Sequence, residues 1–322
     1  PVDVIYQPVA DEDGETDPGS RNLYRGISQA VGQLSRIDPR GDILVFLSGE
    51  REIREAMKYL GRQNLRHTEV LPLYARLSGA EQRRVFHPGA ARRIILSTNV
   101  AETSLTVPRI RFVIDTGFAR ISRYAHRSRI QRLPIEPVSQ ASANQRMGRC
   151  GRLGPGTCIR LYSEEDFSLR PDFTEPEILR TSLASVILRM TTMNLGAVEA
   201  FPFIDAPAPR MISDAYQLLF ELGAVDGERA PTKLGYQLSR WPLDVRLARM
   251  IAEGERQGCL EDLLVLASAL SIQDPRERPL ESQDAADQSH RRFADDQSDF
   301  ITLLRLWDYL RKARHEHTGN QF

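Results

Sequence analysis

The sequence predicts an α/β protein built on a doubly wound parallel sheet and followed by a mainly helical region. Short apolar segments alternate with amphipathic ones over residues 41–115, a pattern typical of strands that alternate with helices. From about residue 176 the apolar residues recur at helical spacing instead. The 322 residues are enough for two or three domains with separate cores.

The first region contains four predicted strands, over residues 43–47, 69–74, 93–97 and 111–115, and a further strand over 157–162 closes it. A helix is predicted from Gly49 to about Leu60. Another runs from Ser78 to Phe86, where Ser78 and Glu81 have the spacing of a capping box. The acidic, turn-rich residues 9–20 predict a surface loop.

Three polar segments follow predicted strands or helices, at residues 97–106, 115–117 and 145–152. Ligands of a doubly wound sheet gather at the carboxyl ends of its strands. We therefore expect all three segments to lie together at that edge of the sheet.

Residues 118–139 depart from the strand and helix alternation and predict a β-hairpin inserted into the sheet domain, with two short strands around residues 124–128. Between Arg109 and Arg132 there are seven arginines and a single acid, Asp115. Projecting cations can contact phosphates, so Arg123, Arg127 and Arg129 are predicted to bind nucleic acid. The alternative is a solvated arginine-rich face.

The second half predicts helices over residues 176–195 and 212–222, the latter ended by Gly223, with a small wing formed by residues 224–225 and 230–234. This pattern indicates a winged-helix domain. Further helices are predicted over residues 244–257, 260–270 and 300–313, and the charged residues 273–298 are expected to be irregular. Because they lie on helical segments, Trp241, Trp307 and Tyr309 are expected to be core residues.

Composition excludes several classes of protein. The formal net charge is zero, so contacts to nucleic acid must come from local patches. No apolar run is long enough to cross a bilayer, and the first residues lack a signal-peptide pattern. The three cysteines show no C-x-x-C spacing and the six histidines are scattered, so neither a metal site nor a disulfide framework is predicted, and a reducing cytoplasm is expected.

Residues 145–152, QRMGRCGR, carry three arginines at every third position, Arg146, Arg149 and Arg152. We expect their forked side chains to converge on one polyanion. A guanidinium is permanently charged and neutralises the charge that grows on the oxygens of a phosphoryl group in transfer. The chain has no G-x-x-x-x-G-K-[ST] phosphate cradle, which indicates one half of an enzyme.

Residues 97–104, STNVAETS, follow a predicted strand directly. Hydroxyls, an amide and backbone N–H groups at a strand end can hold a nucleic-acid backbone or a nucleotide. The alternative interpretation is a capped helix start.

Three segments in this order, ILVFLSGEREI, LSTNVAETSLTVPRIRFVIDTG and NQRMGRCGR, resemble motifs IV, V and VI of DEAH-box RNA helicases. The connecting segments resemble the bacterial HrpA type of this family more narrowly, and the resemblance covers nearly the whole chain. It implies a second RecA-like domain over residues 1–172, a winged-helix domain over 173–241 and an incomplete ratchet-like domain over 242–322. A first RecA-like domain with the P-loop and the DEAH box would precede Pro1, and an OB-fold would follow Phe322.

The resemblance also implies roles in catalysis. Arg149 and Arg152 resemble arginine fingers, and Gln145 resembles the residue that positions the γ-phosphate or the attacking water. Arg146 is ambiguous, because a structural salt bridge would explain it equally well.

Further residues resemble binding positions. Phe86 resembles the aromatic residue that stacks on the base, and Ser104 and Asp115 resemble contacts to the ribose side of the nucleotide. Thr98, with Asn99 beside it, resembles the hydroxyl that grips the RNA backbone.

The function implied by the resemblance is half of an ATP-dependent helicase motor. ATP with Mg²⁺ would be bound mainly by the missing domain, and the complete monomer would translocate 3′ to 5′ on single-stranded RNA and unwind duplexes with a 3′ overhang, with the hairpin as a wedge. The piece alone is expected to be inactive. The alternative is a non-catalytic RNA-binding scaffold or regulator, which a P-loop and a DEAH box upstream of Pro1 would exclude.

Overall fold

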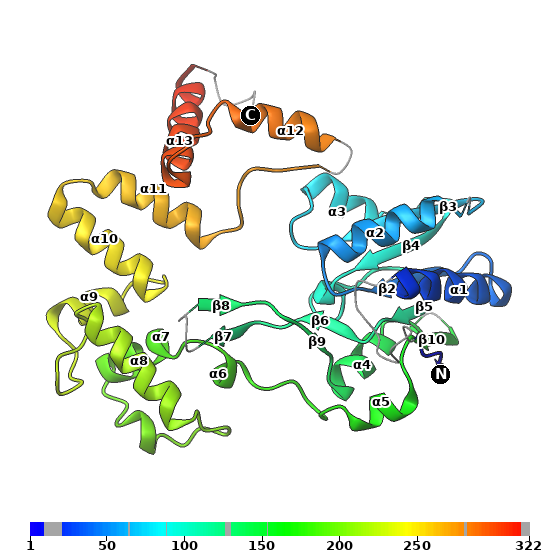
Figure 1. The fold of residues 1–322 in the computed structure, drawn as a ribbon, viewed down its shortest axis with the longest axis horizontal. Helices are drawn as coiled ribbons and strands as arrows, with labels where there is room; N and C mark the ends of the chain where they lie inside the picture. The colour runs from blue at the N-terminus through cyan, green and yellow to red at the C-terminus, as the bar shows by residue number, and fades with distance from the viewer. Residues whose placement is uncertain are drawn as a thin grey trace. The chain divides into compact units, whose positions relative to one another are not determined.

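The computed structural model describes residues 1–9, 21–63, 65–87, 89–125, 130–152, 154–279 and 282–316, and Figure 1 shows their helices and strands. The chain forms two compact units. The first contains Pro1–Arg123 and Arg132–Glu175, and the second contains Tyr124–Gln131 and Pro176–Phe322. The further division predicted near residue 241 stays a prediction. Except for Val9, the loop predicted over residues 9–20 lies outside the described residues.

The first unit is built on a six-stranded sheet in which all neighbouring strands are parallel. Its strands are β1 (Val2–Tyr6), β2 (Asp42–Phe46), β3 (Thr68–Leu73), β4 (Arg92–Ser97), β5 (Ile110–Asp115) and β10 (Gly156–Arg160), in the order β1-β10-β5-β2-β4-β3. The predicted parallel sheet is confirmed, with β1 as an additional edge strand. Strands β2, β4 and β10 are buried at every position, which explains the apolar runs within β2 and β4. Their buried residues also include the charged Asp42, Arg93 and Arg160.

The helices of the first unit are α1 (Arg21–Ile37), α2 (Glu50–Gly61), α3 (Gly79–Phe86), α4 (Gln140–Met147) and α5 (Glu164–Leu169). The sequence analysis did not identify α1. The capping box of α3 is confirmed, since the Ser78 hydroxyl accepts from the Glu81 N–H at 3.3 Å and the Glu81 carboxylate accepts from the Ser78 N–H at 3.1 Å. Val85 of α3, Met147 of α4 and the following Cys150 pack in one core cluster against the sheet.

The inserted hairpin is also confirmed. Strand β6 (Phe118–Arg120) pairs antiparallel with β9 (Ile135–Pro137), and β7 (Arg123–Ala125) forms a two-stranded sheet with β8 (Ile130–Arg132). Residues 126–129, between β7 and β8, lie outside the described residues.

The second unit is helical. Its elements are α6 (Glu177–Arg180), α7 (Ala184–Thr192), η2 (Val198–Ala200), α8 (Pro209–Glu221), α9 (Lys233–Ser239), α10 (Val245–Gln257), α11 (Leu260–Ser271), α12 (Gln283–Arg291) and α13 (Asp299–Glu316). Apolar residues of α7, α8, α9 and α10 form its core, including Ile187, Leu219 and Ala248. Among the described residues, no helix is long and apolar enough to span a membrane.

The single helix predicted over residues 176–195 was wrong, because the chain breaks it into α6 and α7. Thr181 adopts an extended backbone, and its hydroxyl donates to the carbonyl of Glu177 at 2.9 Å. Threonine and serine side chains can bond to the nearby backbone in this way and compete with a continuous helix.

Two other local predictions need correction. The wing is reduced to one antiparallel bridge between Val225 and Pro231, because Thr232 caps α9 and turns residues 233–234 into helix. Residues 273–298 are not wholly irregular, since they contain α12, whose charged sequence buries no side chain and therefore shows no apolar periodicity.

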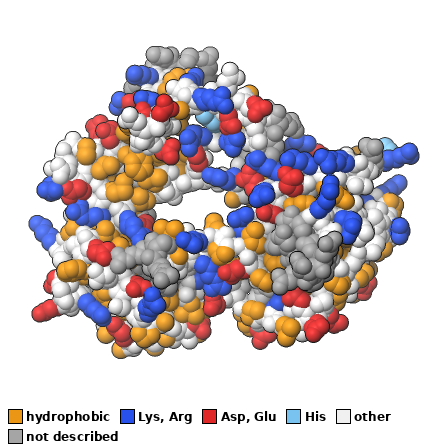
Figure 2. Space-filling view, viewed as in Figure 1, with side chains coloured by type: hydrophobic (Ala, Val, Ile, Leu, Met, Phe, Trp, Pro, Cys, Tyr) orange, Lys and Arg blue, Asp and Glu red, His pale blue; other side chains and the backbone are white. Residues whose placement is uncertain are grey.

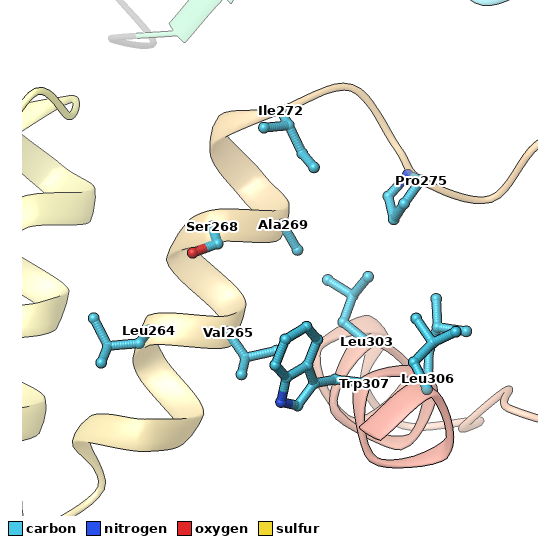
Figure 3. Close-up of a pocket in the computed structure, with 10 residues that line it drawn as sticks. Leu264, Val265, Ser268, Ala269, Ile272, Pro275, Leu303, Leu306 and Trp307 are labelled. Atoms are coloured by element: carbon cyan, nitrogen blue, oxygen red, sulfur yellow. The ribbon is translucent and has the colours of Figure 1, made fainter. Parts of the chain in front are cut away.

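An apolar cavity of about 330 Å³ lies between α11 and α13. Figure 3 shows Trp307 of α13 directed toward Val265 of α11, and Figure 2 shows apolar side chains gathered on the surface over α11. Trp307 and Tyr309 are 49% and 44% exposed, so their assignment to the core was wrong. Trp241 is partly buried against the core of the second unit, as predicted.

Candidate functional site

Two of the three polar segments lie at the carboxyl edge of the sheet, as predicted. The N–H of Thr98 donates to the Leu73 carbonyl at 3.2 Å, and the N–H of Thr116 donates to the Phe46 carbonyl at 3.4 Å, which ties both segments to neighbouring strand ends. Residues 145–152 instead form the end of α4 and the connection into β10. From there Arg146 reaches Glu102 and Asp115, and Arg149 reaches the carbonyls of Glu102 and Leu105, so the three segments lie together as predicted.

Arg146 joins these segments from inside the protein. Its side chain is fully buried, its Nε donates to Glu102 at 2.9 Å, and its Nη1 donates to Asp115 at 2.8 Å. The guanidinium also lies over the Phe46 ring, 4.9 Å from its centroid. The structural interpretation of Arg146 is therefore correct, and the expectation that all three arginines converge on one polyanion was wrong.

Asp115 is fully buried, and both of its carboxylate oxygens accept hydrogen bonds. One oxygen accepts from Arg146 and from the N–H of Gly117 at 2.9 Å, and the other accepts from the hydroxyl of Tyr162 at 2.9 Å. Burial raises the pKa of Asp115, but the pairing with Arg146 and these hydrogen bonds outweigh it, so its pKa lies below the ordinary value. Asp115 cannot make the expected contact to the ribose, because its carboxylate is paired with Arg146 and neither carboxylate oxygen is exposed.

Glu102 links the carboxyl edge to α4. Its carboxylate accepts from the hydroxyl of Ser142 at 2.6 Å as well as from Arg146, and its side chain is only 13% exposed. Ser142 and Arg146 are four residues apart and so lie on the same face of α4.

Arg149 and Arg152 follow α4. Arg149 is half-buried, and its guanidinium donates to the backbone carbonyls of Glu102 and Leu105. Arg152 is exposed, and its Nε donates to the carbonyl of Gly148 at 3.3 Å. Burial, and then the nearby charge of Arg152, hold the pKa of Arg149 below its ordinary value. Arg149 and Arg152 thus place two cations on this short connection.

The remaining predicted residues keep accessible polar or aromatic groups. Asn99, Ser104 and Gln145 are exposed, and Thr98 is half-buried. Phe86, at the end of α3, is half-buried and packs against the same core cluster as Leu105 and Met147. Cys150 is buried, and burial raises the pKa of its thiol to about 11.

Arg123, predicted as a free phosphate contact, is instead paired with two carboxylates. Its guanidinium donates to Glu136 at 2.8 and 3.0 Å and to Glu175. Side-chain hydrogen bonds to these two residues raise its pKa further above the ordinary value. Arg127 and Arg129 lie outside the described residues, so their role stays a prediction.

The sequence analysis missed the residues that hold this site together, Glu102, Ser142 and Tyr162. The spacing of Ser142 and Arg146 on one helix face was the available signal for a shared partner. Within the described ranges, no three His, Cys, Asp or Glu side chains are grouped to hold a metal ion.

Comparison with known families gives two matches. Residues 27–154 match the Helicase conserved C-terminal domain, and residues 244–303 match the ratchet-like Helicase associated domain (HA2). A solved structure, that of the DExH-box NTPase HrpB of E. coli, superposes with a TM-score of 0.73 at 28% identity, covering 97% of this chain and 37% of that one. This similarity confirms the RecA-like fold of the sheet domain.

Relatives match over essentially the whole chain. It is 57% identical over 329 residues to the ATP-dependent RNA helicase HrpA homolog of Haemophilus influenzae, covering 100% of this chain and 25% of that protein. It is 56% identical over 327 residues to the ATP-dependent RNA helicase HrpA of Escherichia coli, again covering 100% and 25%. A human relative, the probable ATP-dependent RNA helicase DHX34, is 37% identical over 329 residues, covering 99% and 28%.

The chain thus spans about a quarter of the length of its bacterial relatives. The predicted resemblance is confirmed, and the domain boundaries and residue roles that it implied stay predictions. Over its whole length, this chain corresponds to one segment of the HrpA-type DEAH-box RNA helicases.

Proposed function

We propose that this chain is one half of the motor of an ATP-dependent RNA helicase, which supplies arginine side chains to the nucleotide and a grip on single-stranded RNA. The relatives that it matches throughout bear that name. The proposal requires a partner domain with the P-loop and the DEAH box, in the same parent chain.

The pair Arg149 and Arg152 is the observation that carries the proposal. Neither side chain has an ion-pair partner among the residues that the structure describes, since both guanidinium groups donate to backbone carbonyls only. Burial, and then the charge of Arg152, lower the pKa of Arg149. Two like charges held together repel each other, and an anionic ligand would relieve that repulsion. Guanidinium groups at a transferring phosphoryl group stabilise the charge that develops on its oxygens.

The surrounding donors fit a nucleotide bound against this chain. The guanidinium of Arg149 donates to the carbonyls of Glu102 and Leu105, and the exposed Ser104 lies between these two residues in the chain. We assign Gln145 to orienting the terminal phosphate or the attacking water, Ser104 to the ribose side and Phe86 to the base. ATP would supply the phosphoryl group whose transfer drives the motor, and the partner domain would supply the phosphate cradle and the ligands of Mg²⁺.

The proposed RNA contact lies at the carboxyl edge of the sheet. Thr98 and Asn99 present a hydroxyl and an amide there, and such groups suit phosphate and sugar contacts that do not depend on base sequence. We assign 3′ to 5′ translocation and strand separation by the hairpin to the complete parent protein. Within it the chain would alternate between holding and releasing RNA.

The test is ATP turnover by the full-length parent with and without single-stranded RNA. We expect turnover that RNA stimulates and that falls by about 10³ in Arg149→Ala or Arg152→Ala. Arg256→Ala is a matched control, since Arg256 is an exposed arginine of the second unit paired with Glu253. A parent that binds RNA but shows no turnover would favour the scaffold alternative and contradict the proposal.

A further inference from the structure

We propose that Glu102 is a positioning residue that couples the RNA contact at Thr98 and Asn99 to Arg149. The inference rests on the proposed function and deepens it, because it names the connection between the two binding regions. Glu102 matches none of the residues assigned to ligand contact above.

The first link is backbone. Residues Asn99–Ala101 form one turn of 3-10 helix, η1, which begins directly after Thr98. The N–H of Glu102 donates to the carbonyl of Asn99 at 2.9 Å and closes this turn. Thr98, Asn99 and Glu102 are therefore joined in one short hydrogen-bonded turn.

The second link is the carboxylate of Glu102. It accepts from the Ser142 hydroxyl at 2.6 Å and from the Arg146 Nε at 2.9 Å, two groups on one face of α4. With only 13% of the side chain exposed, water competes weakly for these hydrogen bonds, and hydrogen bonds to a charged group are strong. The carboxylate thus fixes the turn to the helix that carries Gln145 and leads to Arg149.

The third link is the carbonyl of Glu102, which accepts from the guanidinium of Arg149. The same residue therefore holds α4 through its side chain and Arg149 through its backbone. A shift of the turn when RNA binds would change the position of Arg149 directly. Glu102 therefore forms a contiguous connection between the RNA contact and Arg149.

The test is the RNA stimulation of ATP turnover by the full-length parent, measured as the ratio of turnover at saturating RNA to turnover without RNA. We expect Glu102→Ala to lower this ratio by about 10-fold, within the usual range of coupling between two sites. RNA affinity should change little, because Thr98 and Asn99 remain. A purely structural role would lower both turnover rates together and leave the ratio unchanged.

A rescue variant separates coupling from damage to the fold. In Glu102→Gln the amide oxygen can accept from Arg146 and the amide NH₂ can donate to Ser142, so most of the stimulation should return. Asp166→Ala is the matched control, since Asp166 pairs with another buried arginine, Arg170, at 2.7 Å and contacts neither Glu102 nor Arg149. Its ratio should equal that of the wild type.

The outcomes are distinguishable. A wild-type parent whose turnover RNA does not stimulate would overturn the proposed function. A stimulated wild type together with an equally stimulated Glu102→Ala would overturn the coupling role alone. A ratio lowered equally in Glu102→Ala and Asp166→Ala would also overturn it.

Discussion

Replacing Arg146 by methionine should destabilise the first unit strongly in this chain alone. Methionine keeps much of the side-chain volume but leaves the fully buried Asp115 without its cation. Removing one partner of a buried ion pair costs about 3–5 kcal/mol, because the other charge remains buried and uncompensated. Arg123→Met is the matched control, since its partners Glu136 and Glu175 are 27% and 54% exposed, and it should cost less than about 1 kcal/mol.

The pH dependence of Arg146→Met has a definite sign. In the wild type the pKa of Asp115 is lowered, so this pair stabilises the fold at neutral pH and its contribution is lost only as pH falls through that lowered pKa. In the variant the hydrogen bonds from Gly117 and Tyr162 remain, but no cation offsets the burial of the carboxyl group, so its pKa should rise above that of the wild type. The penalty is therefore largest at neutral pH and shrinks as the pH falls and Asp115 takes up a proton.

Hydrogen exchange in increasing urea measures the loss of stability in Arg146→Met separately for the two units. Peptides from β2 and β5 report the first unit, and peptides from α8 report the second as an internal control. Arg146→Met with Asp115→Asn should regain part of the lost stability, because the fully buried charge of Asp115 is removed. Glu102 still loses its cation, but its carboxylate keeps the hydrogen bond from Ser142. A loss below about 1 kcal/mol in the single variant, or no gain in the double variant, would show that Arg146 does not stabilise the fold by compensating the buried charge of Asp115.

Three further predictions concern this chain alone. It should hydrolyse no ATP, because phosphoryl transfer needs a phosphate cradle as well as arginines, and turnover abolished by Arg149→Ala would contradict this. Ser78→Ala should cost about 1 kcal/mol by removing the cap of α3, and unchanged hydrogen exchange in that helix would contradict it. Gly235→Ala should lower the unfolding midpoint of the second unit, measured by tryptophan fluorescence, because the added Cβ would lie 2.0 Å from the Ala224 carbonyl oxygen. Gly227→Ala is the control, since a Cβ there meets nothing within 4 Å. Equal midpoints for the two variants would exclude the clash.

The sheet could be predicted because strands such as β2 and β4 have apolar runs between their polar ends, and because α3 carries a capping signal in the sequence. Strand β1 was missed because only alternate residues are half-buried in this edge strand, and α12 was missed because it buries none of its side chains. Both failures have one cause. The spacing of apolar residues reveals an element only where that element buries side chains, and β1 and α12 bury few or none, so their formation depends on partners elsewhere in the chain.

The site was predicted less completely than the fold. The types and spacing of Arg149 and Arg152 pointed to an anion site, but spacing alone could not show that Arg146 turns inward while the other two do not. That choice depends on Asp115 and Glu102, which are 31 and 44 residues away along the chain. Arg123 was misjudged for the same reason, since its partner Glu175 is 52 residues away.

In the proposed function, Arg149 acts on the phosphoryl group in transfer rather than on nucleotide binding. Measuring kcat for ATP and the nucleotide Kd of the full-length parent, with Arg149→Ala beside the wild type, tests this role. We expect a fall in kcat of about 10³ with a much smaller change in Kd, because such an arginine stabilises the transition state. An unchanged kcat, or a loss that appears wholly in Kd, would contradict it.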